Sequence, residues 1–262
     1  MILIRDVAVM KKFVLLGCVC GLSACGGGGG QIDASYKTLR VFSDSSGVAV
    51  GTGSDGSKAL VLMPEISAVV TEINSTSDTS DTELNLEDFP VVGNTERSTI
   101  RQGAVTEDGL TQNFLIYEID GEQGFGLVTL PEYDMKYLLV SGSEMIGNPS
   151  GAFTYTGDQI VEAWQSGAFR EVGTVTIGAN FDTNSFTYSG ETANSSLTGT
   201  GILEVDQGRF TDIDATLKVS GQSYETTIHG LVNGNVAETA TGVFHTNDST
   251  PDYVGAFVAK KN

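Results

Sequence analysis

The chain contains little cysteine, proline, histidine and tryptophan, and far fewer basic than acidic residues. Its three cysteines, Cys18, Cys20 and Cys25, all lie in the first 25 residues. The chain after Cys25 therefore has no cysteine with which to form a disulfide. Such a chain is stabilised by its hydrophobic core and by strand pairing alone. Proline is scarce, glycine is abundant, and no long amphipathic helical pattern occurs, so the sequence predicts an all-β fold.

Basic residues number 14 against 33 acidic ones, which gives a formal net charge of −19. Acidity of this kind repels nucleic acid and anionic lipid, so we expect no nucleic-acid partner. It is compatible with a basic partner, with cation binding, or with a surface that is simply well solvated.

Sequence motifs for catalysis and cofactor binding are also lacking. The two histidines, His229 and His245, lie within strand-like patterns and have no further ligand at metal-site spacing. Gly51, Gly53 and Gly56 spell G-x-G-x-x-G, but this motif lies between two strand-like runs instead of opening a helix. We therefore predict no catalytic residue, no cofactor, no metal site and no enzyme activity. A hydrolase stays a remote alternative, because the abundant carboxylates leave many possible pairs.

Residues 1–24 have the layout of a secretory signal. Lys11 and Lys12 precede an apolar run at 13–19, which is too short to span a bilayer, and small residues follow. Met10 makes a better signal start than Met1, so either can be the true first residue.

The tetrapeptide 22–25, Leu-Ser-Ala-Cys, resembles the lipobox of bacterial lipoproteins. The resemblance implies that Cys25 carries palmitate-type acyl chains and becomes the mature N-terminus. Several acyl chains suffice for stable membrane anchoring. Cleavage before Cys25 removes a net charge of +2, and the glycines at 26–30 make residues 25–35 a flexible tether. Gly26 in place of Asp favours sorting to the outer membrane, again by resemblance.

Residues 36–141 predict a β-rich region with an acidic loop. Its expected strands are 36–42, a hairpin of 48–50 with 59–62, a second hairpin of 113–119 with 124–130, and 137–140. Residues 74–88 are rich in Ser, Thr, Asp and Glu, which predicts a loop or a disordered lobe. This loop lacks the spacing and the turn glycine of an EF-hand, which argues against a specific calcium site. Residues 142–151 form the candidate boundary.

Residues 142–262 show a regular period of two. Val175, Ile177 and Ala179 alternate with polar residues, as do Ile213, Ala215, Leu217 and Val219, so each segment predicts a strand with one buried face. The candidate strands are 151–156, 159–165, 172–181, 184–189, 199–205, 211–220, 223–231 and 239–246, with 253–260 as a possible closing strand.

These segments predict an eight-stranded antiparallel β-barrel or a sandwich. A membrane-spanning barrel is the competing interpretation, but it needs strands of about nine to eleven residues with an apolar outer band. Most of the candidates are shorter, and about eight strands leave an interior that side chains fill. We therefore expect a water-soluble barrel. Trp164 and the aromatic residues 153, 155, 186, 188 and 244 could line a cleft, but at strand spacing they are more often core.

Three stretches of this half resemble the barrel domain of the transferrin-binding protein B family. They are Gly151–Gly157, the run 173–184 with Phe181-Asp182, and the end of the chain at His229–Phe244 and Tyr253–Lys261. The lipobox followed by a glycine run is also common in that family. The resemblance implies a single lobe, in which residues 36–141 are the handle-like region and 142–262 the barrel. The resemblance does not assign a binding role to any residue of this chain.

The resemblance further implies a monomeric lipoprotein of the outer membrane, anchored at the cell surface, that captures an external protein or an iron or solute ligand. The alternative is a structural or scaffolding lipoprotein that faces the periplasm. The sequence does not distinguish the two, and it does not indicate transferrin or iron in particular.

Overall fold

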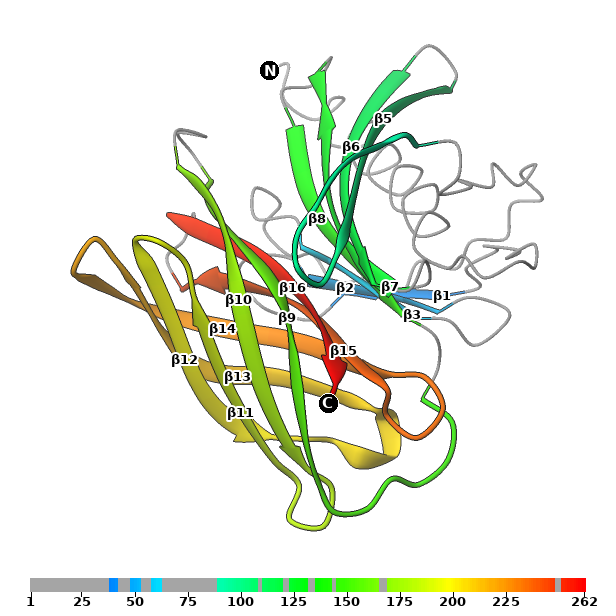
Figure 1. The fold of residues 1–262 in the computed structure, drawn as a ribbon, viewed down its shortest axis with the longest axis vertical. Coiled ribbons are helices and arrows are strands. Elements are labelled where there is room, and N and C mark those ends of the chain that lie inside the picture. Colours follow the sequence, from blue (N-terminus) through cyan, green and yellow to red (C-terminus); the bar gives the residue numbers. More distant parts are fainter. Residues whose placement is uncertain are drawn as a thin grey trace, which may run out of the picture.

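The fold is all-β. The computed structural model describes residues 38–41, 48–52, 58–62, 89–107, 110–119, 123–131, 135–142, 145–164, 169–247 and 251–262. Eight strands form an open sheet and eight form a closed antiparallel barrel, with the sheet standing against one side of the barrel (Figure 1). This arrangement confirms the predicted fold class. No helix in the described ranges is long and apolar enough to cross a membrane.

The barrel is built from consecutive hairpins and closes by pairing its last strand with its first. Its strands are β9 (Ala152–Ala163), β10 (Arg170–Asn180), β11 (Ser185–Glu191), β12 (Ser195–Ile202), β13 (Arg209–Val219), β14 (Gln222–Asn233), β15 (Thr239–Thr246) and β16 (Tyr253–Lys261). A 3-10 turn, Val205–Gln207, precedes β13.

One sequence-based expectation about the barrel was wrong. Segments 151–156 and 159–165 form the single strand β9, and the segment 253–260 supplies the eighth strand, β16. The pair Gly157-Asp158 resembles a turn but lies inside β9. A methyl group on Gly157 would lie 1.9 Å from the Val258 carbonyl oxygen of the paired strand, so only glycine fits this close approach.

The sheet has the strand order β1-β2-β3-β8-β7-β6-β5-β4, which leaves β1 and β4 at its edges. Its strands are β1 (Thr38–Val41), β2 (Val48–Thr52), β3 (Lys58–Leu62), β4 (Val91–Asn94), β5 (Thr99–Glu107), β6 (Leu110–Ile119), β7 (Gln123–Leu130) and β8 (Met135–Gly142). The β2–β3 and β6–β7 hairpins match the two predicted ones. The sequence did not predict β4 and β5. The division into domains at 36–141 and 142–262 stays a prediction, although β8 ends at Gly142 and β9 begins at Ala152.

Two hydrophobic clusters of the described residues stabilise the barrel and its contact with the sheet. The first fills the barrel, with Tyr155, Phe186, Phe210, Phe244 and Phe257 among its largest side chains. The second lies between the sheet and the outer face of β9, β14, β15 and β16, and we call this surface the junction. Apolar side chains of both parts meet there: Tyr117, Ile119, Phe125, Leu127, Leu138 and Val140 from the sheet, and Ile160, Trp164, Leu231, Val243, Val254, Ala256 and Val258 from the barrel.

Candidate functional site

Several residues that the sequence singled out lie outside the described residues. They are Cys25, the tether at 25–35, the acidic loop at 74–88, and Gly53 and Gly56 of the glycine motif. Gly51 lies in β2, which pairs directly with β3, so the described part of this motif is a β-hairpin. Lipidation of Cys25 therefore stays a prediction.

The aromatic residues considered for a ligand cleft lie in the cores. Tyr155, Phe186, Tyr188 and Phe244 are buried inside the barrel, and Phe153 packs partly buried at its end. Burial raises the pKa of the Tyr155 and Tyr188 hydroxyls, so both stay protonated. Trp164 is buried in the junction instead of the barrel interior. These side chains stabilise the fold and do not line a cleft.

The structure brings the two histidines together, which sequence spacing did not suggest. His229 on β14 and His245 on β15 are both buried, and their rings stack with centroids 5.6 Å apart. In the described ranges, no group of three or more His, Cys, Asp or Glu side chains is arranged to hold a metal ion. The pair therefore does not form a metal centre of the usual kind.

The junction contains a buried carboxylate that holds a loop of the sheet. Asp158 of β9 accepts hydrogen bonds from the hydroxyls of Thr95, at 2.5 Å, and Ser98. Thr95 Oγ1 in turn accepts from the backbone N–H groups of Arg97 and Ser98, at 3.0 and 2.7 Å. The turn between β4 and β5 is thus fixed to the barrel, and the position of Arg97 within it is set by Asp158.

Two ion pairs with a buried glutamate lie elsewhere, one in the barrel and one in the sheet. Arg170 Nε donates to Glu162 Oε2 of β9 at 2.9 Å, and Arg101 Nε donates to Glu118 Oε1 at 2.6 Å, with both glutamates buried. The pKa of the nearby Tyr117 hydroxyl is raised by burial, lowered by Arg170 and raised by Asp158, and the net change is a rise. The Arg101–Glu118 pair lies on the face of the sheet that is turned away from the barrel, because Glu118 alternates with Tyr117 and Ile119, which face the junction.

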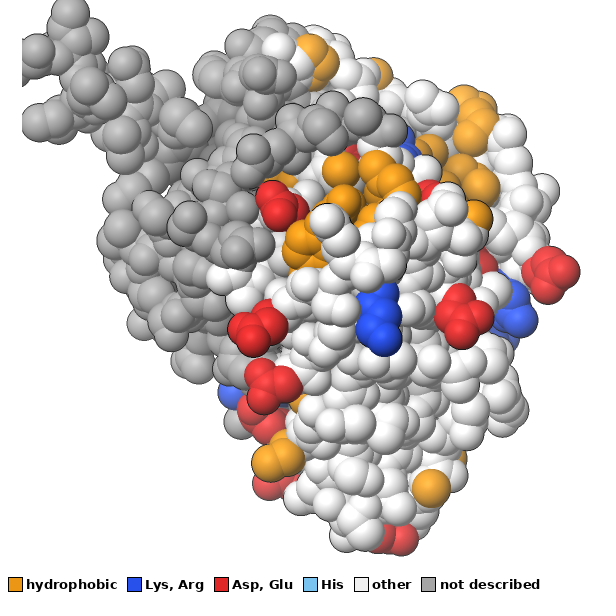
Figure 2. Space-filling view, turned by 90° about the vertical axis from the view of Figure 1, so that its left-hand side faces the viewer, with side chains coloured by type: hydrophobic (Ala, Val, Ile, Leu, Met, Phe, Trp, Pro, Cys, Tyr) orange, Lys and Arg blue, Asp and Glu red, His pale blue; other side chains and the backbone are white. Residues whose placement is uncertain are grey.

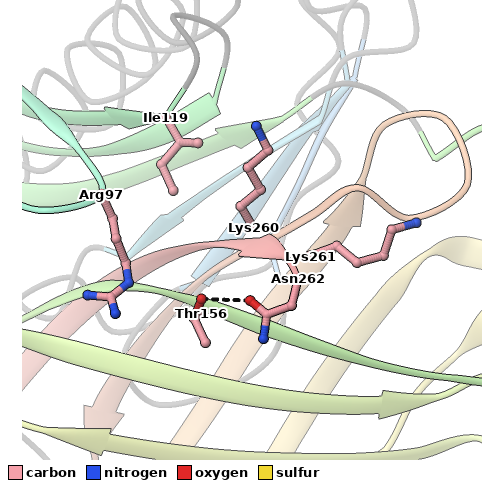
Figure 3. A pocket seen from close by; sticks show the side chains of 6 residues that line it. All are labelled: Arg97, Ile119, Thr156, Lys260, Lys261 and Asn262. Carbon is pink, nitrogen blue, oxygen red and sulfur yellow. Dashed lines mark hydrogen bonds between the residues drawn. The ribbon is translucent and has the colours of Figure 1, made fainter.

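A small cavity opens where the β4–β5 turn meets the end of β16. It has a volume of ≈ 240 Å³ and is lined by Arg97, Ile119, Thr156, Lys260, Lys261 and Asn262. We call it the basic cavity. Figure 3 shows Arg97 reaching in from the turn, Lys260 extending beside Ile119, and Lys261 pointing away from Arg97. Thr156 Oγ1 donates a hydrogen bond to Asn262 Oδ1 at 2.8 Å.

Sequence reasoning missed this cavity. Arg97 and Lys260 are 163 positions apart and come from different sheets. The one sequence signal is the basic pair Lys260-Lys261 just before the last residue, which contributes only to the family resemblance.

Exposed apolar side chains lie at several further places in the described residues, among them Val172 and Ile202 of the barrel, which are 40% and 69% exposed. Val91 and Val92 on the edge strand β4 are 51% and 56% exposed, and Ile146 and Val236 at one end of the barrel are 63% and 45% exposed. The loop containing Val236 is bound to the segment before β9 by hydrogen bonds between Val236 N and Ile146 O and between Ile146 N and Gly234 O. Figure 2 shows one face of the molecule, on which apolar side chains gather in the upper part and charged ones lie below and beside them.

Neither family models nor curated protein sequences match the chain, but solved structures do. Transferrin binding protein B (isotype 1) from serogroup B Neisseria meningitidis is similar over 90% of this chain and 54% of that chain, with 12% identity and a TM-score of 0.51. The chain has a transferrin-binding protein B-like fold. It spans about half the length of that protein.

Two other structures are similar at lower scores. Transferrin binding protein B from Haemophilus parasuis, a Trp-to-Ala mutant, shares 13% identity over 82% of this chain and 54% of that chain, with a TM-score of 0.46. The N-lobe of lactoferrin binding protein B from Moraxella bovis shares 12% identity over 87% of this chain and 99% of that chain, with a TM-score of 0.38. The fold assignment rests on the Neisseria structure alone.

Proposed function

We propose that the chain is a lipid-anchored binding lipoprotein of the outer membrane, monomeric, displayed at the cell surface, and capturing an external protein or solute. The observation that carries this proposal is the combined arrangement of a closed barrel and a sheet packed on its outer face, which the chain shares with a protein named for binding transferrin. The proposal assigns the chain no catalytic role, because the similar structure that supports the fold is that of a transferrin binding protein. Fold alone does not establish function, so the ligand stays open.

The lipobox supports the location of the protein. In this proposal Cys25 is acylated, residues 1–24 are removed, and the tether at 25–35 holds the folded part away from the membrane. Exposed apolar residues on β4 and at the barrel end support a binding role, since apolar side chains at an exposed edge are suited to protein contacts. Val236 strengthens this point, because its φ of 59° is rare for a β-branched residue and strained backbone often marks functional loops.

Protease shaving of intact cells tests the proposal. The wild-type chain is expected to lose its signal when intact cells are treated with protease, and to incorporate a palmitate analogue. Cys25→Ala is expected to abolish labelling and to release the protein from the membrane fraction. Full protection until the outer membrane is broken would contradict surface display and would favour the periplasmic scaffolding alternative. Labelling of the Cys25→Ala variant would contradict lipidation at this residue.

A further inference from the structure

Three aromatic side chains meet at one end of the barrel, which we call the mouth. The mouth is the end where the chain turns from β9 to β10, from β11 to β12, from β13 to β14 and from β15 to β16, and it lies opposite to the end with Ile146 and Val236. The ring centroid of Tyr253 lies 5.0 Å from that of Tyr224 and 5.9 Å from that of Phe169, both in edge-to-face contacts. The cluster therefore joins three different hairpins of the barrel.

The three rings close the end of the barrel but remain accessible. Each packs against the barrel core and is only partly buried, whereas Phe210 and Phe257 deeper in the barrel are fully buried. The mouth lies on the left-hand side of Figure 1, and Figure 2 looks onto this side, where apolar side chains gather in the upper part of the view. A tyrosine at such a place offers an apolar ring and a polar hydroxyl to a ligand, and this combination is common at binding surfaces.

Backbone hydrogen bonds hold two of the rings in place before any ligand arrives. Thr246 Oγ1 accepts from the backbone N–H of Asp252 at 2.9 Å and from that of Tyr253 at 3.3 Å. The Phe169 carbonyl accepts from the backbone N–H of Ala163 at 2.9 Å. A site that is ordered in advance loses less conformational entropy when it binds.

Each ring has a carboxylate within two positions along the chain. The pairs are Phe169 with Glu171, Tyr224 with Glu225, and Tyr253 with Asp252. Glu225 and Asp252 are exposed. Partial burial raises the pKa of the Tyr253 hydroxyl, and the nearby Tyr224 and Asp252 raise it further, so this phenol stays neutral. The mouth thus combines neutral aromatic rings with negative charge.

Positive charge in the described part of the barrel lies away from the rings. Arg170 Nε donates to the buried Glu162 at 2.9 Å, and Lys218 lies on the outer face of β13, because its neighbours in that strand face the core. None of the four turns at the mouth contains Lys or Arg, and this holds for 165–168 and 248–250, whose structure is not described. The remaining barrel cations lie at the opposite end: Arg209, Lys260 and Lys261.

We propose that the mouth binds a basic segment of the captured protein, with a lysine or arginine side chain against the rings of Tyr224 and Tyr253 and paired with the Asp252 carboxylate. A cation within about 6 Å of an aromatic centroid is attracted to the face of the ring. The net charge of −19 attracts such a partner from a distance, and the mouth supplies the specific contacts. This inference rests on the proposed function, since it names the surface and the chemistry of that capture.

Fluorescence anisotropy of a labelled peptide with the full mature chain tests the mouth. The probe carries four arginines separated by glycines, and the same peptide with glutamine in place of arginine is the neutral control. Tyr253→Leu removes a ring and Asp252→Asn removes a charge at the mouth. Asp214→Asn is the matched control, because it removes an exposed carboxylate from the outer face of β13 and changes the net charge equally.

We expect saturable binding of the arginine peptide at low ionic strength, weakening as salt is added. Binding is expected to be roughly fivefold weaker in Tyr253→Leu and in Asp252→Asn, and to change less than about twofold in Asp214→Asn. If Tyr253→Leu fails to fold, Tyr224→Leu and Asp252→Asn decide the outcome.

Three results would overturn the proposal. They are the absence of saturable binding, equal weakening by Asp252→Asn and Asp214→Asn, which would show attraction by net charge alone, and equal binding of the glutamine peptide, which would show apolar docking. Protease shaving reports surface display and does not depend on peptide binding. A protected chain that binds the peptide would contradict only the proposed function, and a surface-displayed chain that does not bind it would contradict only this inference.

Discussion

The barrel and the sheet each contain eight strands, but they differ in whether their edge strands are paired and in how their cores are covered. Every barrel strand pairs on both sides, and its interior is filled by its own side chains. The sheet is open at β1 and β4, and one of its faces is covered by the barrel's outer face, while Phe114, Ile116 and Val128 are buried on the other face. Closure removes edges from a β-sheet, whereas an open sheet needs a covering surface. The difference indicates that the barrel is the self-sufficient unit and that the sheet depends on it.

The largest expected effect comes from separating the two parts. We expect a fragment of residues 142–262 to keep a cooperative β-sheet fold, and a fragment of residues 36–141 to lose ordered tertiary structure. The second fragment leaves Tyr117, Phe125 and Leu127 without the barrel side chains that cover them. Amide dispersion in NMR spectra and thermal unfolding by circular dichroism measure this. The barrel fragment should also bind a hydrophobic dye, because it exposes Leu231 and Val243. Cooperative unfolding of the sheet fragment alone would contradict the comparison.

Matched glycine substitutions compare packing in the two parts. A methyl group on Gly255 of β16 would lie 2.1 Å from Phe244 Cζ and 2.2 Å from the Ile160 carbonyl oxygen. The closed barrel cannot move that backbone freely, so we expect Gly255→Ala to lower the free energy of unfolding by about 3 kcal/mol. On Gly126 of β7 the nearest atom would lie 3.8 Å away, at ordinary contact distance. Gly126→Ala is therefore expected to change stability by less than about 1 kcal/mol. Urea unfolding measures both, and equal losses would show that the two parts pack alike.

Two ion pairs that differ in burial allow a further comparison, the Arg101–Glu118 pair of the sheet and the Arg209–Glu204 pair of the barrel. Glu118 is 4% exposed where it accepts from Arg101, and removing that arginine leaves a buried carboxylate with its charge uncompensated. We expect Arg101→Ala to cost about 2 kcal/mol, at the low end for such a loss because the arginine side chain is itself partly exposed.

The barrel pair Arg209–Glu204 is the matched control. Its side chains are 28% and 36% exposed, at an N–O distance of 2.7 Å. Arg209→Ala is therefore expected to cost less than about 1 kcal/mol in the same urea unfolding. A larger loss for Arg209→Ala than for Arg101→Ala would contradict this ranking of burial.

Alternation of apolar and polar residues predicted the barrel strands because each has one face in the interior. Val175, Ile177 and Ala179 were expected on the inner face of one strand, and all three are buried there. The same reasoning divided β9 into two strands, since Gly157-Asp158 resembles a turn. The buried Asp158 carboxylate accepts hydrogen bonds from the hydroxyls of Thr95 and Ser98, which lie about 60 residues earlier in the chain. A partner so distant in sequence leaves no local pattern.

Long-range pairing also explains what the sequence did not predict in the sheet and the cavity. Strand β5 contains Arg101, Gln102 and Gly103, which do not resemble a strand until Glu118 pairs with the arginine and Phe89 packs over the glycine. The basic cavity exists only because the β4–β5 turn is bound beside the end of β16. Local periodicity predicted most of the barrel, but contacts between the sheet and the barrel create the candidate site.

The smallest expected effect concerns a turn of the barrel that a carboxylate holds in place. Glu171 of β10 accepts hydrogen bonds from the Thr192 hydroxyl and from the side chain and backbone N–H of Asn194. Partial burial raises the pKa of this carboxyl, but the hydrogen bonds outweigh burial and hold the pKa below its ordinary value. A group with a lowered pKa in the folded state stabilises that state above its unfolded pKa, and this stabilisation is lost as pH falls through the folded pKa.

Wild type and Glu171→Gln therefore differ in how their stability depends on pH. We expect the difference in free energy of unfolding to be largest at about pH 6 and to shrink by about pH 3, as the wild-type carboxylate becomes protonated. Urea unfolding at several pH values measures this, and NMR titration of the Glu171 carboxyl gives its pKa directly. If the difference in free energy of unfolding between the two proteins stays constant across this pH range, the ionised Glu171 carboxylate does not stabilise the β11–β12 turn. Strand pairing within the closed barrel would then be sufficient to hold that turn.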